Sequence, residues 1–180
     1  MIRMYFRKEK DKYRHIKRKG IKTTDELLDF IADLDDNDKL VTYGAVNNQA
    51  YYEDEVMEGI FVHTGGYRME KQEFTDPFDF PDGFYTTTVY VADEENGNLC
   101  LELISAALVK FGDGQNLIST VAELRGILKK IREKNVMECP ILSRDDNFEL
   151  KGAVTNNTYL DVYEEIAGGR RYVGLEMKYY

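Results

Sequence analysis

The expected fold is decided by the stretch YRHIKRKGIKTTDELLDFIADL, residues 13–34. Its first eight residues are rich in Lys and Arg and end at a glycine, which is typical of an exposed or edge strand. Thr23 and Glu26 then have the spacing of a capping box, in which the threonine side chain accepts a backbone hydrogen bond and the glutamate reaches back. Leucine and isoleucine follow at helical spacing. The stretch therefore predicts an edge strand that leads into an amphipathic helix.

Strands are expected after this helix, because residues 39–52 and 57–63 are rich in β-branched and aromatic residues. Residues 64–83 contain two adjacent glycines and two of the three prolines, which indicates a loop. The sequence FYTTTVYVAD, residues 84–93, alternates and is the strongest strand pattern in the chain. Residues 98–111 fit either its hairpin partner or a helix, and we favour the hairpin because Asn-Gly precedes them.

A second capped helix is predicted at residues 119–134, with Thr120 and Glu123 at capping-box spacing. A short strand, an amphipathic segment and a final strand at residues 170–180 follow it. The order of strand, capped helix and strands thus occurs twice. We expect one α+β domain over residues 1–180, with two pseudo-repeated β-α-β-β halves whose antiparallel sheets surround a central cleft. The expected halves are residues 12–66 and 84–180, joined by a loop at 67–83.

The charge is unevenly distributed along the 180 residues. The chain has a net charge of −9, but residues 1–22 carry ten basic and two acidic residues. The acidic remainder repels phosphates, so we expect no direct nucleic-acid binding by this part of the chain. The basic segment is interpreted either as a docking extension or as a strand with solvated lysines. No apolar run is long enough for a membrane span, and no signal peptide is evident, so we expect a cytoplasmic protein without membrane contact.

Motifs for catalysis or metal binding are not found in the sequence. His15 and His63 lack the partner motifs of catalytic histidines, and no nucleophile elbow occurs. Cys100 and Cys139 are far apart and belong to no metal-binding pair, so we expect two reduced, partly buried thiols. We therefore predict no catalytic residue, no metal and no cofactor.

Aromatic residues are the compositional anomaly: thirteen Tyr and nine Phe occur without a Trp. Tyrosine is a common strand residue, and it either fills sheet faces or lines a cleft. Rings in a cleft bind flat or cationic molecules by stacking and cation–π attraction, with each contact worth about 0.5–2 kcal/mol. The residues expected to bind such a ligand are Tyr43, Tyr52, Phe61, Tyr85 and Tyr90.

The layout resembles the GyrI-like effector-binding domain, the ligand-sensing part of MerR- and AraC-type multidrug regulators. The resemblance is carried by YRHIKRKG before a helix, by TYGAV and GIFV, and by FPDGFYTTTVYV, in which Pro81, Gly83 and Tyr85 match an opening pattern of the family. It implies two pseudo-symmetric halves around an aromatic cleft that often holds an acidic residue. The segment CPILSRDD lacks the glutamate and tyrosine usual there in the family, so no acidic pocket residue is assigned.

The sequence thus favours a small-molecule effector-binding protein, a stand-alone sensor or sequestration module for an aromatic or cationic ligand. One alternative is an acidic interaction or inhibitor protein that binds a basic partner through the acidic clusters at 33–38, 53–58 and 93–95. Another is a small hydrolase that uses a cleft carboxylate. Binding is favoured over catalysis, because no residue is singled out as a catalytic group.

Overall fold

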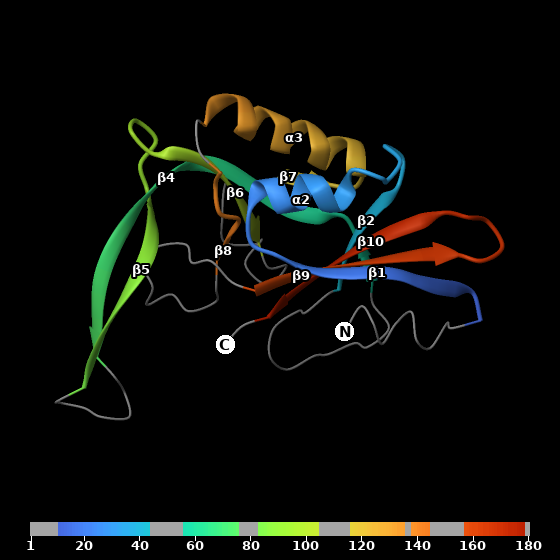
Figure 1. Ribbon diagram of the computed structural model, residues 1–180, viewed down its shortest axis with the longest axis horizontal. Helices are drawn as coiled ribbons and strands as arrows, with labels where there is room; N and C mark the ends of the chain where they lie inside the picture. The colour runs from blue at the N-terminus through green and yellow to red at the C-terminus, as the bar shows by residue number, and fades with distance from the viewer. Residues whose placement is uncertain are drawn as a thin grey trace.

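Strands dominate the structure, a computed structural model that describes residues 11–43, 56–75, 83–104, 116–135, 138–144 and 157–178 (Figure 1). Two helices and ten strands lie in these ranges, which makes the protein a mixed α+β fold. In chain order they are β1 (Tyr13–Ile21), α2 (Thr24–Ile31), β2 (Lys39–Tyr43), β3 (Val56–Glu58), β4 (Ile60–Thr75), β5 (Phe84–Ala92), β6 (Asn98–Ile104), β7 (Asn116–Ile118), α3 (Val121–Lys134), β8 (Leu142–Arg144), β9 (Asn157–Glu165) and β10 (Arg171–Lys178).

The strands form two mainly antiparallel sheets. The first sheet has the order β1-β9-β10-β2-β3, and the second has the order β5-β4-β6-β8 with β7 also paired to β4. Phe61 of β4 faces both β6 and β7, so these two strands lie on opposite edges of β4. Only β10 with β2 and β6 with β8 run parallel among the described pairs.

Each helix joins two strands of one sheet across a strand pair that comes from elsewhere in the chain. The strands joined by α2, β1 and β2, flank β9 and β10. Those joined by α3, β7 and β8, flank β4 and β6. Both connections are split β-α-β units, in which a helical crossover returns the chain in parallel. Each sheet consequently contains strands from both of the halves expected from the sequence.

The two helices begin in the same way. The hydroxyl oxygen of Thr23 accepts a hydrogen bond of 3.2 Å from the amide of Glu26, and that of Thr120 accepts one of 3.3 Å from Glu123. Each glutamate accepts in return from the amide just before its threonine. Both predicted capping boxes and both predicted helices are therefore confirmed.

Each helix N-terminus also pairs with the segment that follows the other helix. Isolated antiparallel bridges join Thr23 to Pro140 and Thr120 to Lys39. Beside each bridge, one backbone hydrogen bond of 3.0 Å and one of 2.9 Å connect the two segments. The backbone at the start of each helix is thus hydrogen-bonded to the segment that follows the other helix.

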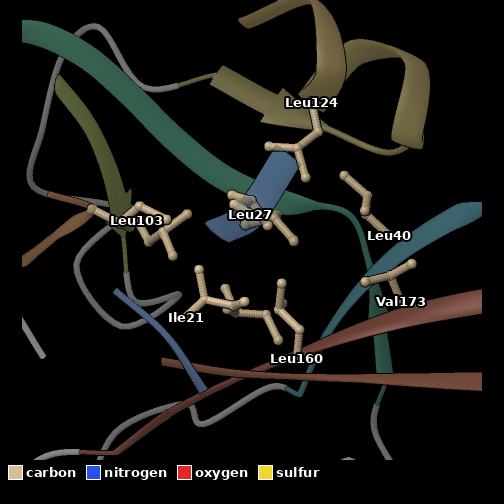
Figure 2. Close-up of a pocket in the computed structure, with 10 residues that line it drawn as sticks. Ile21, Leu27, Leu40, Leu103, Leu124, Leu160 and Val173 are labelled. Atoms are coloured by element: carbon tan, nitrogen blue, oxygen red, sulfur yellow. The ribbon is translucent and has the colours of Figure 1, made fainter. Parts of the chain in front are cut away.

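The main core lies between the helices and one face of each sheet. Figure 1 shows both helices on the same side of the sheets. Figure 2 shows labelled side chains from both sheets and both helices converging there. The cavity that remains between them measures about 10 Å³, which is room for a water-sized sphere at most. It is lined only by apolar residues: Ile21, Leu27, Leu40, Ile60, Leu103, Leu124, Ile141, Leu160, Val173 and Leu175.

Most predicted strands are confirmed within the described ranges. β1 is the outermost strand of the first sheet, as expected for an edge strand. Residues 98–104 form the strand β6 rather than a helix, and residues 105–111 lie outside the description. The predicted hairpin with residues 84–93 is wrong, because β5 and β6 both pair with β4, which lies between them. The predicted strand at 39–52 is found for Lys39–Tyr43, beyond which residues 44–52 also lie outside it.

The loop predicted at residues 64–83 is wrong for residues 64–75, which continue β4. The strand persists through the two glycines because it is paired there: β6 pairs with β4 up to Tyr67, and β5 pairs from Tyr67 onward. Gly66 packs so closely that an added Cβ would lie 2.4 Å from the carbonyl oxygen of Asp93. The glycines therefore allow close packing within a strand and do not mark a loop.

Candidate functional site

Two of the five expected ligand-binding residues lie on one face of the second sheet. Val62 belongs to the core under the helices, so its neighbour Phe61 points to the opposite, helix-distal face. Tyr90 pairs across the β4–β5 ladder with Met69, which has the same alternation as Phe61 and therefore shares that face.

The other three expected residues are not brought to this face by anything that the structure describes. Tyr43 lies in β2 and Tyr85 in β5, but the description does not extend to their side chains. Tyr52 lies outside the described residues. Their expected role as ligand-binding residues stays a prediction.

A buried carboxylate, Glu102 of β6, lies on the same helix-distal face. Leu101 and Leu103 on either side of it belong to the core under the helices, so alternation directs Glu102 away from them. Its exposed fraction is 0%. The hydroxyl of Tyr67 donates a hydrogen bond to Oε2 of Glu102, and Nδ1 of His63 lies 3.7 Å from the same oxygen. These three residues, His63, Tyr67 and Glu102, are called the Glu102 site below.

The Glu102 site can favour a positive group chemically. A carboxylate away from water attracts a nearby cation more strongly than an exposed one, because the surroundings screen the charge less. The ring of Tyr67 is buried, and the side chain of His63 is 30% exposed, so the histidine lies between the carboxylate and solvent. Aromatic faces beside a carboxylate are the arrangement that proteins use to bind organic cations.

Gly65 allows the two rings of the site to come together. An added Cβ at this position would lie 2.9 Å from Cε1 of His63 and 3.3 Å from Cε2 of Tyr67. A side chain here would therefore displace at least one ring. Gly65, one of the two glycines that suggest a loop in the sequence, is thus a requirement of the site.

Two thiols lie beside the site in an apolar cluster. Cys100, Cys139, Tyr67 and Leu142 are packed together, with Tyr90 against them. Both cysteines are buried free thiols, as expected. Burial, together with the adjacent Cys139 thiol, raises the pKa of Cys100 to about 12, and burial also raises the pKa of Cys139 and of Tyr90. This side of the site is therefore uncharged at neutral pH.

A second buried carboxylate, Asp161 of β9, occurs in the first sheet. Leu160 and Val162 beside it face the core, so Asp161 also lies on a helix-distal face. Arg18 donates a hydrogen bond of 2.6 Å to one carboxylate oxygen, and Nε2 of His15 lies 2.9 Å from the other. This bond connects β1 to β9, and Arg18 neutralises the charge of the carboxylate. Asp161 is therefore not proposed as a ligand site.

The acidic clusters are candidates for docking a basic partner. Within the described residues, their carboxylates contact other parts of the chain. In the first cluster, the carboxylates of Asp33 and Asp36 pair with basic residues of β1 and α3. In the third, Asp93 accepts a hydrogen bond from the amide of Asn96 in the β5–β6 turn, and Glu94 accepts one from the amide of Gly66 in β4. These contacts give the acidic residues a role in folding that requires no partner.

Sequence reasoning missed Glu102 and Tyr67. The alternation of Leu99, Leu101 and Leu103 gives the face of Glu102 but does not distinguish a buried carboxylate from an exposed one. Its hydrogen-bond donor, Tyr67, is 35 positions away in the chain. A local signal for the site is therefore absent from the segment that carries the carboxylate.

Comparison of the chain with models of protein families, with curated proteins and with solved structures found no match. Neither α2 nor α3, the helices in the described ranges, is long and apolar enough to cross a membrane. Over those ranges, no three His, Cys, Asp or Glu side chains are grouped as a metal site would require. The Glu102 site is thus the candidate functional site within the described residues.

Proposed function

We propose that the chain is a small-molecule effector-binding protein whose aromatic or cationic ligand binds on the helix-distal side of the second sheet. The observation that carries this proposal is the fully buried carboxylate of Glu102 in contact with Tyr67 and near His63. Phe61 and Tyr90 lie on the same face and extend its aromatic surface. This combination of one charge and several rings supports a sensor or sequestration module for an organic cation.

The chemistry of the site favours a flat organic cation over other ligands. A simple amine uses only the carboxylate, and a neutral aromatic molecule uses only the rings. A delocalised aromatic cation uses both, with about 0.5–2 kcal/mol from each cation–π contact. The helix side is closed by the core, whose cavity of about 10 Å³ is far too small for such a molecule. The ligand therefore approaches from the helix-distal side.

We further propose that two related β-α-β-β units make up the molecule and that the cleft lies between them. Matched capping boxes at Thr23 and Thr120 support this, as do the two matched bridges that follow them. Each helix also joins its two strands by a split β-α-β connection, which further supports two related units. In this arrangement each sheet contains strands of both units, so the two units fold together.

Titration with ethidium, a flat aromatic cation, and with phenanthridine, its uncharged ring system, tests the proposed function. Glu102→Gln keeps an acceptor for the Tyr67 hydroxyl but removes the charge. We expect it to weaken ethidium binding about tenfold, or about 1.4 kcal/mol, and to leave phenanthridine binding unchanged. Calorimetry measures both affinities, and thermal denaturation confirms that the variant is folded.

Asp33→Asn is the matched control, because it removes an exposed carboxylate whose side chain is 71% exposed. It should bind both compounds as the unchanged protein does. Ethidium binding that is equal in the unchanged protein and in Glu102→Gln contradicts the proposal, and so does the absence of ethidium binding at any concentration tested.

A further inference from the structure

The outer edge of β5 is open in the part of the chain that the structure describes. β5 ends the strand order of the second sheet, and its recorded partner is β4 on one side. The ladder between them pairs Tyr67–Thr75 with Phe84–Ala92 without a register shift. A strand of nine residues with an unbroken register therefore presents its backbone groups along one edge.

The other outermost strands have features that discourage pairing, and β5 has none of them. β1 carries Arg14, Lys17, Arg18 and Lys19 and has a register shift in its ladder. β3 and β8 are three residues long. The sequence of β5, FYTTTVYVA, contains no charged residue, proline or glycine. Edges of this kind pair with another strand, because charges, bulges and short length are the usual protection against it.

The position of β5 in the fold adds a second reason to expect a partner strand. β6 pairs with β4 only from Phe61 to Tyr67, so beyond Tyr67 the described strands β4 and β5 form a two-stranded ribbon. Figure 1 shows this ribbon extending away from both helices. Two-stranded ribbons are marginally stable in water, and three or more strands are needed for independent stability. Met69 on this ribbon is 67% exposed.

We propose that β5 pairs in antiparallel fashion with β5 of a second copy of the chain, around a two-fold axis at Thr88. Thr88 is the middle residue of the strand, so in this pairing Thr88 of one copy lies opposite Thr88 of the other. The result is a continuous four-stranded sheet in the order β4-β5-β5-β4. This sheet has the three or more strands that independent stability requires, which the two-stranded ribbon alone does not have.

A second copy fits this edge better than a foreign segment does. The chain has a net charge of −9, so most contacts between copies bring like charges together. β5 is uncharged throughout and avoids this repulsion. An isologous pairing is also self-complementary, so it requires no separate recognition of side chains.

Charge substitutions at Thr88 test the pairing in the full chain. Thr88 is exposed, and Thr88→Lys or Thr88→Glu places two like charges opposite each other across the axis. Sedimentation velocity over a range of concentrations should show a monomer–dimer equilibrium for the unchanged protein. Each variant should raise the dimer dissociation constant about fivefold or more. An equimolar mixture of the two should form dimers again, because lysine then faces glutamate.

Thr64→Lys provides the control, since Thr64 is an exposed threonine of β4 that is not on the edge of β5. It should dimerise as the unchanged protein does. Hydrogen exchange gives a second readout: amides of Phe84–Ala92 should become protected as the concentration rises. The proposal is overturned if the unchanged protein stays monomeric at all concentrations. A dimer that is insensitive to both Thr88 substitutions, with protection gained elsewhere, also overturns it.

Discussion

Arg18 donates a hydrogen bond of 2.6 Å to the carboxylate of Asp161, a residue 143 positions later in the chain. The side chain of Asp161 is 1% exposed and that of Arg18 is 15% exposed, so water screens this ion pair little. The bond joins β1, the outermost strand of the first sheet, to β9. It therefore fixes the edge of that sheet in addition to the backbone ladder.

Asp161→Asn should destabilise the protein by about 3 kcal/mol, because it leaves the Arg18 guanidinium in a mostly buried place without its carboxylate. Urea denaturation measures the change in the free energy of unfolding. Asp33→Asn also breaks a pair between β1 and a later element, but it should cost less than about 1 kcal/mol because Asp33 is exposed. Equal losses for the two variants would contradict this account of burial.

Arg125 of α3 stabilises the end of α2. Its Nη2 donates hydrogen bonds of 2.9 Å to the carbonyl oxygen of Ile31, the last residue of α2, and to that of Leu34, three residues beyond it. Arg125→Ala should therefore lower the free energy of unfolding by about 1–3 kcal/mol. Arg132→Ala is its counterpart on the same helix: Arg132 is 60% exposed and pairs with Asp25, so about 0–1 kcal/mol is expected.

Thr23→Ala and Thr120→Ala should each cost about 1 kcal/mol, and the two losses should be similar. Each removes the acceptor of a hydrogen bond to the third residue on, at the matched starts of the two helices. Thr→Ser at either position keeps the hydroxyl and should be close to neutral. Thermal denaturation of the four variants checks both statements, and a harmless alanine at one position alone would show that the two helix starts are not equivalent.

Local signals predicted much of the fold. The capping boxes and the spacing of apolar residues gave both helices, because a helix forms its hydrogen bonds within one segment. The sequence does not predict the whole of β4, because adjacent glycines indicate a loop and the pairing that holds Gly65 and Gly66 in a strand comes from distant segments. Which strands share a sheet was not predicted either, since β1 pairs with β9 from the other end of the chain.

The candidate site was harder to predict than the fold. The sequence identified strand aromatics, and Phe61 and Tyr90 do lie on the face of the proposed site. It did not identify Glu102, because one carboxylate among 33 acidic residues has no distinguishing neighbour in the sequence. The contact with Tyr67 and the proximity of His63 arise only when β4 and β6 pair.

The buried thiol of Cys100 should make stability fall at alkaline pH. In the unfolded chain this thiol loses its proton near its ordinary pKa of 9.0, whereas in the folded protein burial and the Cys139 thiol raise the pKa to about 12. Between pH 9 and 12 the unfolded state therefore binds fewer protons than the folded state. The free energy of unfolding is then unaffected below pH 9 and decreases above it, by up to about 1.4 kcal/mol for each pH unit from this one group. Urea denaturation at several pH values should give a steeper alkaline decline for the unchanged protein than for Cys100→Ala, and parallel declines would show that Cys100 keeps an ordinary pKa in the folded state.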